Sequence, residues 1–344
     1  TITKGKNMNN FKKVGLTALA GSLAAISANA AEMSVSGASV LTYTTEDGTE
    51  TTGNPWGMKT NLGFTASGEV NGYTVSYMQT SADQFAGMSS ARLSVDMGDM
   101  GTIAFDQGSG SGLATIDDKT PTAAEEIWDG LDGAGASATS AGGLVGAAGS
   151  SGVFNYVNTY EGVTLNAALR QGSATSNSDG SSSAVGGSAW DFALTTDGSL
   201  VGVDGLSIGA GYGENEVGTG ANTTTGDDEH ITAFATYAIG PVTAGLQMSD
   251  INMGKNNSYD ERTTAWGLAF NVNENLSISY GEREVEYNND TVAVTGTTEK
   301  GDGVAVAYTM GSIKIAGNRN TVSDNGGVAG SNDSMTEIAV SFAF

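Results

Sequence analysis

The 344-residue chain contains no cysteine, three prolines and a single histidine. Without cysteine it can form neither a disulfide scaffold nor a thiolate metal site or nucleophile. One histidine excludes a histidine-based catalytic triad and a multi-histidine metal site within one chain. The scarcity of proline excludes a collagen-like triple helix. Most familiar enzyme chemistry is therefore excluded, and we expect no catalytic residues.

Basic residues are also scarce, with 14 Lys and Arg against 38 Asp and Glu, which gives a formal net charge of −24. Sequence-independent binding to nucleic acid needs a basic surface that displaces counterions. We therefore expect no nucleic-acid partner. Glycine is plentiful instead, with 51 residues, about twice the average usage of about 7 %.

The first 31 residues contain no acidic side chain. Residues 8–13 form a short basic segment, residues 14–26 an apolar run, and Ala28-Asn29-Ala30 a small-x-small motif, which is the order of a secretory signal peptide. An apolar helix of this length spans about 20 Å, less than the bilayer core of about 30 Å, so a membrane anchor is disfavoured. We expect cleavage between Ala30 and Ala31 and a natural start at Met8. Residues 1–30 are then an extension with a signal peptide, and residues 31–344 the mature domain.

The mature chain alternates between apolar and polar residues with a period of two. The alternation is clear in residues 58–70, 90–97, 162–170, 276–280 and 338–344. Such a pattern predicts strands whose two faces meet different environments. No long segment has apolar residues at helical spacing, and none offers the uninterrupted apolar run that a transmembrane helix needs.

Two kinds of connection alternate along the chain. Short ones contain Gly, Asn or Pro, as in Asn71-Gly72, whereas the others are long and polar. Short turns on one side and long loops on the other are typical of an outer-membrane β-barrel. A strand-built span must close because every backbone group in hydrocarbon needs a partner. The predicted strands are 33–44, 57–70, 72–81, 89–98, 101–107, 151–160, 162–172, 188–197, 205–214, 230–239, 241–250, 262–272, 275–285, 302–310, 312–320 and 334–344.

The sequence therefore predicts an all-β fold, a 16-stranded antiparallel transmembrane barrel with short periplasmic turns and long extracellular loops. A barrel of this size is too wide for side chains to fill and leaves a water channel. A secreted, soluble all-β adhesive or binding protein is the alternative from a different class. It would share the export signal and the acidity, but it would not need connections of alternating length. The chain also lacks the fixed repeat of a solenoid.

The two ends of the mature chain carry a family resemblance. The signal end Ala28-Asn29-Ala30, the start at residues 31–37 and the terminal residues 337–344 resemble a Gram-negative outer-membrane general porin, most closely the alphaproteobacterial, Rhodobacter-type branch. The resemblance implies a homotrimer in outer-membrane lipid that passes ions and small hydrophilic solutes by passive diffusion. A solute-selective outer-membrane channel is the alternative within this class. The resemblance also implies that the terminal strand, with Phe342 and Phe344, is read by the outer-membrane assembly machinery.

The resemblance further implies that the third long loop, residues 108–150, folds into the barrel and narrows it. The alternative is a solvated surface loop, although long loops without secondary structure are usually functional or disordered. The loop at residues 82–88 is short, so we do not expect it to latch onto a neighbouring subunit. The acidic residues of the candidate constriction are Asp117, Asp118, Glu125, Glu126, Asp129 and Asp132.

Five basic residues should point into the barrel because they occupy the strand positions that alternate with the apolar, outward-facing ones. By the resemblance, they face the acidic loop across the channel. The alternative is that each one pairs with a strand neighbour, such as Asp96 beside Arg92. The acidic loop and the net charge of −28 on residues 31–344 predict a preference for cations. The five residues are Lys59, Arg92, Arg170, Arg283 and Lys314.

Further acidic clusters are expected in the other loops. Clustered carboxylates suit Ca²⁺, but no segment has the twelve-residue calcium-loop pattern, which favours a simple soluble acidic rim. No other cofactor is expected. Aromatic residues that fit membrane-interface girdles are Tyr43, Trp56, Tyr73, Tyr77, Trp266, Tyr280 and Phe344. The acidic clusters are Glu46-Asp47, Asp227-Asp228-Glu229, Asp260-Glu261 and Glu282/Glu284/Glu286.

Overall fold

The computed structural model describes residues 32–48, 52–81, 87–131, 144–149, 151–172, 187–216, 226–254, 260–288 and 296–344. The predicted signal peptide, its cleavage site and Asp132 lie outside these residues. The strands are β1 (Glu32–Gly48), β2 (Trp56–Val70), β3 (Tyr73–Ser81), β4 (Met88–Asp96), β5 (Thr102–Gln107), β6 (Ser151–Tyr160), β7 (Val163–Arg170), β8 (Ala189–Asp197), β9 (Leu206–Asn215), β10 (Asp228–Ile239), β11 (Val242–Asn252), β12 (Asp260–Asn271), β13 (Leu276–Asn288), β14 (Glu299–Met310), β15 (Ile313–Ser323) and β16 (Asp333–Ala343). Four short 3₁₀ helices of the described residues are η2 (Gly98–Met100), η3 (Gly112–Ile116), η4 (Gly198–Val201) and η5 (Asn325–Gly327).

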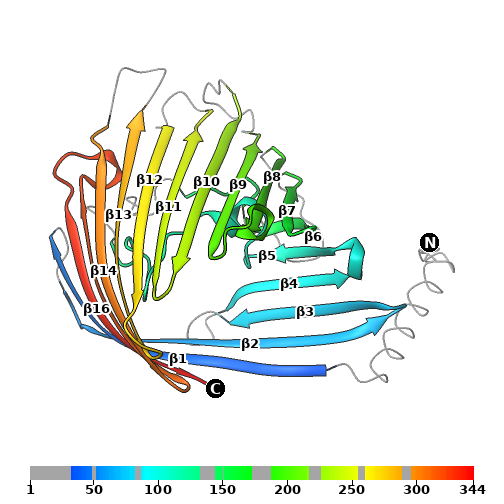
Figure 1. The fold of residues 1–344 in the computed structure, drawn as a ribbon, viewed down its shortest axis with the longest axis horizontal. Coiled ribbons are helices and arrows are strands. Elements are labelled where there is room, and N and C mark those ends of the chain that lie inside the picture. Colours follow the sequence, from blue (N-terminus) through cyan, green and yellow to red (C-terminus); the bar gives the residue numbers. More distant parts are fainter. Residues whose placement is uncertain are drawn as a thin grey trace, which may run out of the picture.

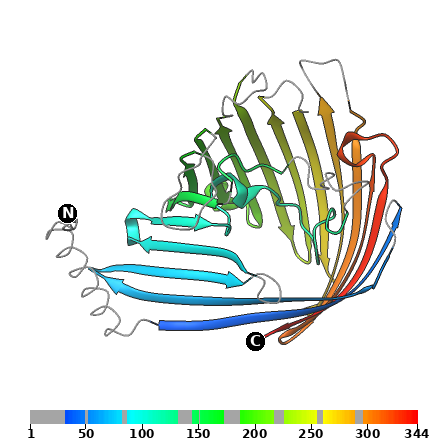
Figure 2. The ribbon, with the colours of Figure 1, turned by 180° about the vertical axis from the view of Figure 1, so that it is seen from behind.

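The strands form one closed barrel in which each strand pairs antiparallel with its neighbours in the sequence, and β16 pairs with β1. Figures 1 and 2 show the first and last strands side by side where the ring closes. Ala38 lies opposite Ala343 in this pair. The Phe344 amide donates to the Gly37 carbonyl at 3.0 Å, and the Gly37 amide donates to the Phe344 carbonyl at 2.9 Å. Closure leaves no edge strand, and the predicted 16-stranded antiparallel barrel is confirmed.

One end of the barrel carries tight turns. Asn71 and Gly72, between β2 and β3, have φ of 54° and 85°, and Glu161 and Gly162, between β6 and β7, have 48° and 83°. Two successive residues with positive φ make the turn whose twist matches that of a hairpin. The predicted tight turns are confirmed at both places. We call this the turn end and the opposite one the loop end.

The strands extend further at the loop end than the sequence predicted. β1 continues to Gly48, β10 begins at Asp228, β12 begins at Asp260 and β13 continues to Asn288. The acidic clusters that were expected in loops therefore lie largely within strands. Glu282, Glu284 and Glu286, for example, belong to β13. In β1 the alternation ends because residues 44–48 are polar on both faces. In β13 it is inverted, because the polar Glu284 and Glu286 face outward and the apolar Val285 and Tyr287 are buried inside.

The two faces of the sheet differ as the alternation predicted. On β13, Ile278 and Tyr280 are exposed on the outside, whereas Ser279, Arg283 and Val285 are buried on the inside. Two aromatic pairs lie on the outer face: the ring centroids of Tyr43 and Trp56 are 5.0 Å apart, and those of Trp266 and Tyr280 are 5.6 Å apart. Among the described residues, no helix is long and apolar enough to cross a membrane.

The third loop fills part of the interior. We call the described parts of this connection, residues 108–131 and 144–149, loop L3. Leu113, Ile116 and Val145 of L3 are buried with Ala193 and Phe234 of the inner wall. Figures 1 and 2 show the loop that follows β5 passing inside the ring of strands. The predicted in-folded third loop is confirmed, and the apolar core lies between L3 and the wall.

Candidate functional site

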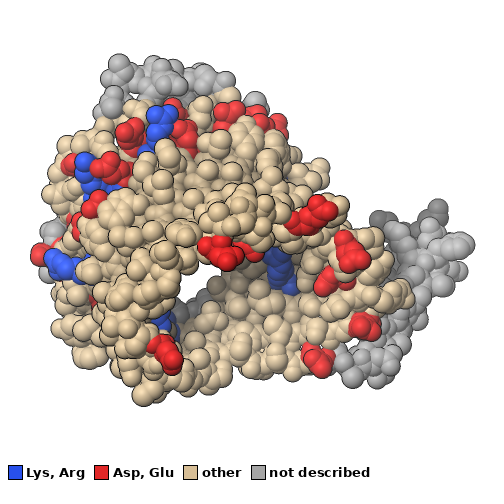
Figure 3. Space-filling model, in the orientation of Figure 1, with Lys and Arg blue, Asp and Glu red and all other residues tan. Residues whose placement is uncertain are grey.

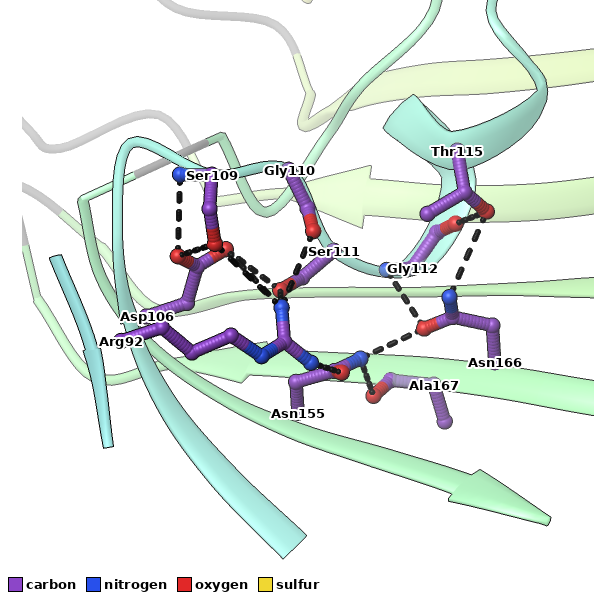
Figure 4. Close-up of polar contacts among 10 residues, drawn as sticks. All are labelled: Arg92, Asp106, Ser109, Gly110, Ser111, Gly112, Thr115, Asn155, Asn166 and Ala167. Carbon is purple, nitrogen blue, oxygen red and sulfur yellow. Dashed lines mark hydrogen bonds and ion pairs between the residues drawn. The ribbon is translucent and has the colours of Figure 1, made fainter. Parts of the chain in front are cut away.

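The start of L3 is held by an ion pair between neighbouring strands (Figure 4). Arg92 of β4 lies opposite Asp106 of β5, and its Nη1 is 3.7 Å from Asp106 Oδ2. Asp106 is fully buried and accepts hydrogen bonds from the Ser109 amide at 3.0 Å and from the Ser111 hydroxyl at 2.7 Å. The carboxylate thereby fixes the first turn of the loop.

Arg92 does pair with a strand neighbour, as the alternative expected, but the partner is Asp106 and the expectation of Asp96 was wrong. Asp96 accepts a hydrogen bond from the Gly98 amide at 2.9 Å instead. The difference arises because Asp106 stands directly across the sheet from Arg92, whereas Asp96 lies beside the tight turn at the other end of β4.

A chain of amide side chains continues from Arg92 along the wall (Figure 4). Arg92 donates to Asn155 of β6, and Asn155 donates to the side chain of Asn166 of β7. The Asn166 Oδ1 also accepts the Gly112 amide at 2.8 Å. Gly112 has φ of 59°, and an added Cβ would lie 1.8 Å from Asp191 Oδ1. Only glycine fits where L3 meets the wall here.

Asp191 of β8 holds both ends of L3. Its carboxylate accepts the Leu113 amide at 3.0 Å and the Ala148 amide at 2.7 Å, and the side chain is 2 % exposed. Arg170 of β7 donates to the Ala148 carbonyl at 3.1 Å and to Asn215 Oδ1 at 2.8 Å. The outgoing and returning arms of the loop are therefore tied to the same patch of wall.

The middle of L3 crosses the next strands. Gln247 of β11 accepts the Lys119 amide at 2.6 Å and donates to the carbonyls of Ile116 and Asp117 at 2.8 and 2.9 Å. Farther on, the Ala123 amide donates to the Ser279 hydroxyl of β13 at 2.8 Å. These side chains satisfy the backbone of a loop that has no regular structure.

The far part of L3 rests on a buried ion pair. Arg283 of β13 lies 2.9 Å from Glu299 of β14, and both side chains are 3 % exposed. The Tyr287 hydroxyl donates to Glu299 at 2.9 Å. The Arg283 guanidinium lies 5.0 Å from the centre of the Trp128 ring, in cation–π geometry.

Asn320 of β15 completes this attachment, because it donates to the carbonyls of Glu126 and Asp129 at 3.0 and 2.9 Å. The described part of L3 therefore runs along the inner wall from β7–β9 to β13–β15. Each anchor is an inward-facing polar side chain of a strand.

The acidic residues of L3 differ in environment. Asp117 is half-buried, and this burial raises the pKa of its carboxyl group. Asp118 accepts both the amide and the hydroxyl of Thr120 at 2.8 Å, so it stabilises a local turn. Glu125 and Glu126 are exposed, and Asp129 is partly buried.

The pKa of Glu125 is raised above its ordinary value of 4.5, mainly because the group is partly desolvated and then because Asp129 and Glu126 repel its charge. Lys59 and Lys314 oppose the shift. Lys59 of β2 and Lys314 of β15 therefore act electrostatically on the acidic part of L3. Figure 3 shows an open passage through the molecule, with acidic side chains at one edge and basic side chains at others.

The five predicted inward basic residues thus fall into two groups. Arg92, Arg170 and Arg283 hold L3 through hydrogen bonds, ion pairs or a ring contact, whereas Lys59 and Lys314 act on Glu125 through their charge. The sequence analysis missed the anchors on the wall. The only signal in the sequence was a polar residue at a strand position that faces inward, and many residues of the chain have that property. The missed residues that bind L3 directly are Asp106, Asn166, Asp191, Gln247, Ser279 and Asn320. Two more, Asn155 and Glu299, hold Arg92 and Arg283.

The lone His230 of β10 accepts a hydrogen bond from the Gly146 amide at 3.4 Å, which is a structural contact with L3. Within the described ranges, no group of three or more His, Asp or Glu residues is arranged to hold a metal ion. Calcium at the acidic clusters stays a prediction.

No family model matches this sequence, and no curated protein matches it. Solved structures with a similar fold include the following three proteins. OmpT of Vibrio cholerae, described as a trimer form, has a TM-score of 0.64 at 12 % identity and covers 92 % of this chain and 100 % of its own. The outer-membrane channel DcaP of Acinetobacter baumannii has a TM-score of 0.62 at 12 % sequence identity, and the match covers 91 % of this chain and 97 % of DcaP. A mutant of the Rh. blastica porin has a TM-score of 0.56 at 13 % sequence identity, and the match covers 91 % of this chain and 100 % of the porin chain.

Proposed function

We propose that this chain is an integral outer-membrane channel of a Gram-negative bacterium, through which ions and small hydrophilic solutes diffuse passively. One observation carries the proposal: a closed 16-stranded barrel holds its own loop L3 inside the bore, beside an open passage. A barrel of this strand number is too wide to be filled by side chains. An internal loop that is fixed to the wall narrows the bore and sets its charge.

The outer face supports a membrane location. Leu268, Val304 and Ile338 are exposed there as part of a broad apolar surface, and aromatic pairs such as Trp266 and Tyr280 lie on the same face. Soluble proteins rarely expose an apolar surface of this extent, whereas lipid requires it. This observation counts against a secreted soluble protein.

We infer a preference for cations from the charges of L3. Glu125, Glu126 and Asp129 lie close enough together for the other two to raise the pKa of Glu125. On the wall, Lys59 and Lys314 offset part of this negative field. Acidic groups in a low-dielectric passage raise the local concentration of cations, and added salt screens the effect.

Assembly follows the same proposal. The resemblance to general porins and the trimer form described for the OmpT structure support a homotrimer, in which Phe342 and Phe344 serve the outer-membrane assembly machinery. Membership of the Rhodobacter-type branch rests on the end motifs of the sequence. We assign no enzymatic step to the chain.

Reconstitution into a planar lipid bilayer tests the proposal. Insertion should produce stepwise increases of current that scale with salt concentration. Liposome swelling with sugars of increasing mass then separates the two kinds of channel. A general channel shows a smooth decline of rate with size, and a solute-selective channel shows one preferred sugar. Folded, heat-modifiable protein that gives no current steps would refute the proposal.

A further inference from the structure

A shallow apolar groove lies on the outer face of the barrel over β12–β16, with a volume of about 680 Å³. Gly317 of β15 forms its floor, with Val306 of β14 and Ile338 of β16 directly beside it in register. An added Cβ at Gly317 would be 3.8 Å from the Val306 Cγ1 atom, which is ordinary contact. Glycine here leaves a depression in an otherwise continuous apolar surface. The walls include Leu268, Phe270, Ile278, Tyr280 and Val304.

A basic side chain lies at the loop-end side of this groove. Arg319 is two residues beyond Gly317 on the same face of β15, in a row with Tyr280, Val304 and Thr336 of the neighbouring strands. Arg319 is exposed, and its Nη1 donates to the Thr336 hydroxyl at 3.1 Å. A guanidinium has five N–H donors, and no carboxylate of the described residues lies within 4.0 Å of this one.

The other outward-facing basic residues of the described chain have acidic partners. A second outer groove, of about 460 Å³, is lined in part by Arg262, but Arg262 lies 3.0 Å from Asp250. Lys300 lies 2.9 Å from Glu284. Asp302, in the row just beyond Arg319, accepts a hydrogen bond from Thr321 at 2.6 Å. Among the outward-facing basic residues that the structure describes, Arg319 is thus the one that has no carboxylate partner. Its charge is available to an external anion.

We propose that the groove binds an acyl chain of a phosphate-bearing membrane lipid, whose phosphate contacts Arg319. The apolar floor and walls suit the hydrocarbon chain, and arginine suits phosphate because its planar donors form charge-assisted hydrogen bonds. The position along the barrel also fits. Arg319 shares its row with Tyr280, whose ring packs against Trp266, and such aromatic girdles lie at the level of lipid headgroups. The inference rests on the proposed membrane location.

Native mass spectrometry of the detergent-purified protein tests this site, with phosphatidylglycerol as the probe. The wild type should carry one tightly held lipid per chain. R319Q should bind it about tenfold more weakly, because a hydrogen bond to a charged group is lost. G317L should also bind it several-fold more weakly because the side chain fills the floor. R262Q, which changes an outward arginine that already has a carboxylate partner, is the matched control and should bind like the wild type.

Two further probes separate the phosphate from the acyl chain. Diacylglycerol, which lacks the phosphate, should bind as weakly to the wild type as phosphatidylglycerol binds to R319Q. Inorganic phosphate should not displace the lipid. Equal retention of phosphatidylglycerol by the wild type, R319Q and G317L would overturn the proposal. So would a change in the oligomer mass of G317L without a change in lipid retention, because the groove would then be a contact between copies.

Conductance measurements on the same preparations test the proposed channel function separately from lipid binding in the groove. Arg319 and Gly317 face away from L3, so both variants should conduct like the wild type. Absence of current from the wild type would contradict the channel, whereas the lipid measurement would still decide the groove.

Discussion

The guanidinium of Arg283, on the inner wall, lies 5.0 Å from the centre of the Trp128 ring, on loop L3. The same arginine forms an ion pair with Glu299 at 2.9 Å inside the barrel. A loop residue and a wall residue that are far apart in the sequence are therefore joined at one buried site. This contact connects the position of L3 to the integrity of β13 and β14.

We expect Trp128→Leu to loosen the far part of L3 without opening the barrel, because the cation–π contact contributes about 0.5–2 kcal/mol. Single-channel recordings should show greater current noise and closure at lower voltage. Trp190→Leu is the matched control, since Trp190 is exposed on β8, where it stacks on Phe192 outside the bore. Indistinguishable traces from W128L and the wild type would show that this contact does not hold the loop.

Asp191→Asn should release an arm of L3. The two carboxylate oxygens accept the amides of Leu113 and Ala148, whereas an asparagine has one acceptor oxygen. An unsatisfied buried amide costs about 1–3 kcal/mol, so we expect limited proteolysis within L3 to be roughly tenfold faster. Asp197→Asn, at the turn end of the same strand, is the control, and its L3 should be cleaved at the same rate as that of the wild type. Equal rates for D191N and D197N would contradict the anchoring role.

The cation preference should decline as the pH falls. Desolvation and the neighbouring acids Asp129 and Glu126 raise the pKa of Glu125 above 4.5, so the folded channel favours the protonated form and Glu125 loses its charge at a higher pH than an isolated glutamate. Reversal potentials measured from pH 7 to 4 should fall, and the fall should begin at a higher pH than a glutamate of ordinary pKa would give. E125Q should be less cation-preferring at pH 7 and should lack the part of the fall that is due to Glu125.

Glu284→Gln is the control for this titration, because Glu284 faces outward and pairs with Lys300. Its pH profile should match that of the wild type. If E125Q and the wild type had the same profile, Glu125 would not contribute to the field in the bore.

Deletion of residues 342–344 should prevent assembly. These residues pair with residues 37–39 of β1, and each unpaired backbone group in hydrocarbon costs several kcal/mol. We expect degraded or periplasmic protein and no heat-modifiable band in outer membranes. The variant F342L/F344L keeps the backbone pairing but removes the aromatic rings. It therefore distinguishes a defect in barrel closure from a defect in recognition of the aromatic chain end by the assembly machinery. A normal membrane barrel from the deleted chain would contradict this prediction.

The barrel could be predicted from sequence because lipid and water impose opposite demands on alternate residues of every strand. The signal is lost beyond residue 44 of β1, where both faces are polar, and it is inverted beyond Glu284 of β13, where the apolar residues face inward, so the strand ends near Gly48 and Asn288 were missed. The anchors of L3 were missed for a different reason. Asp191 is a single inward residue whose partners, the amides of Leu113 and Ala148, are far away in the sequence, and spacing along the chain carries no information about that contact.

The most direct test is the reversal potential of single channels under a tenfold KCl gradient. We expect the dilute side to become positive, because K⁺ passes more readily than Cl⁻, and we expect the potential to shrink at higher salt. The variant D117N/D118N/E125Q/E126Q should move the potential toward zero while the barrel stays folded, since these residues lie in L3 and outside the sheet. A wild type that prefers Cl⁻, or a neutralised variant with an unchanged potential, would contradict a cation channel controlled by L3.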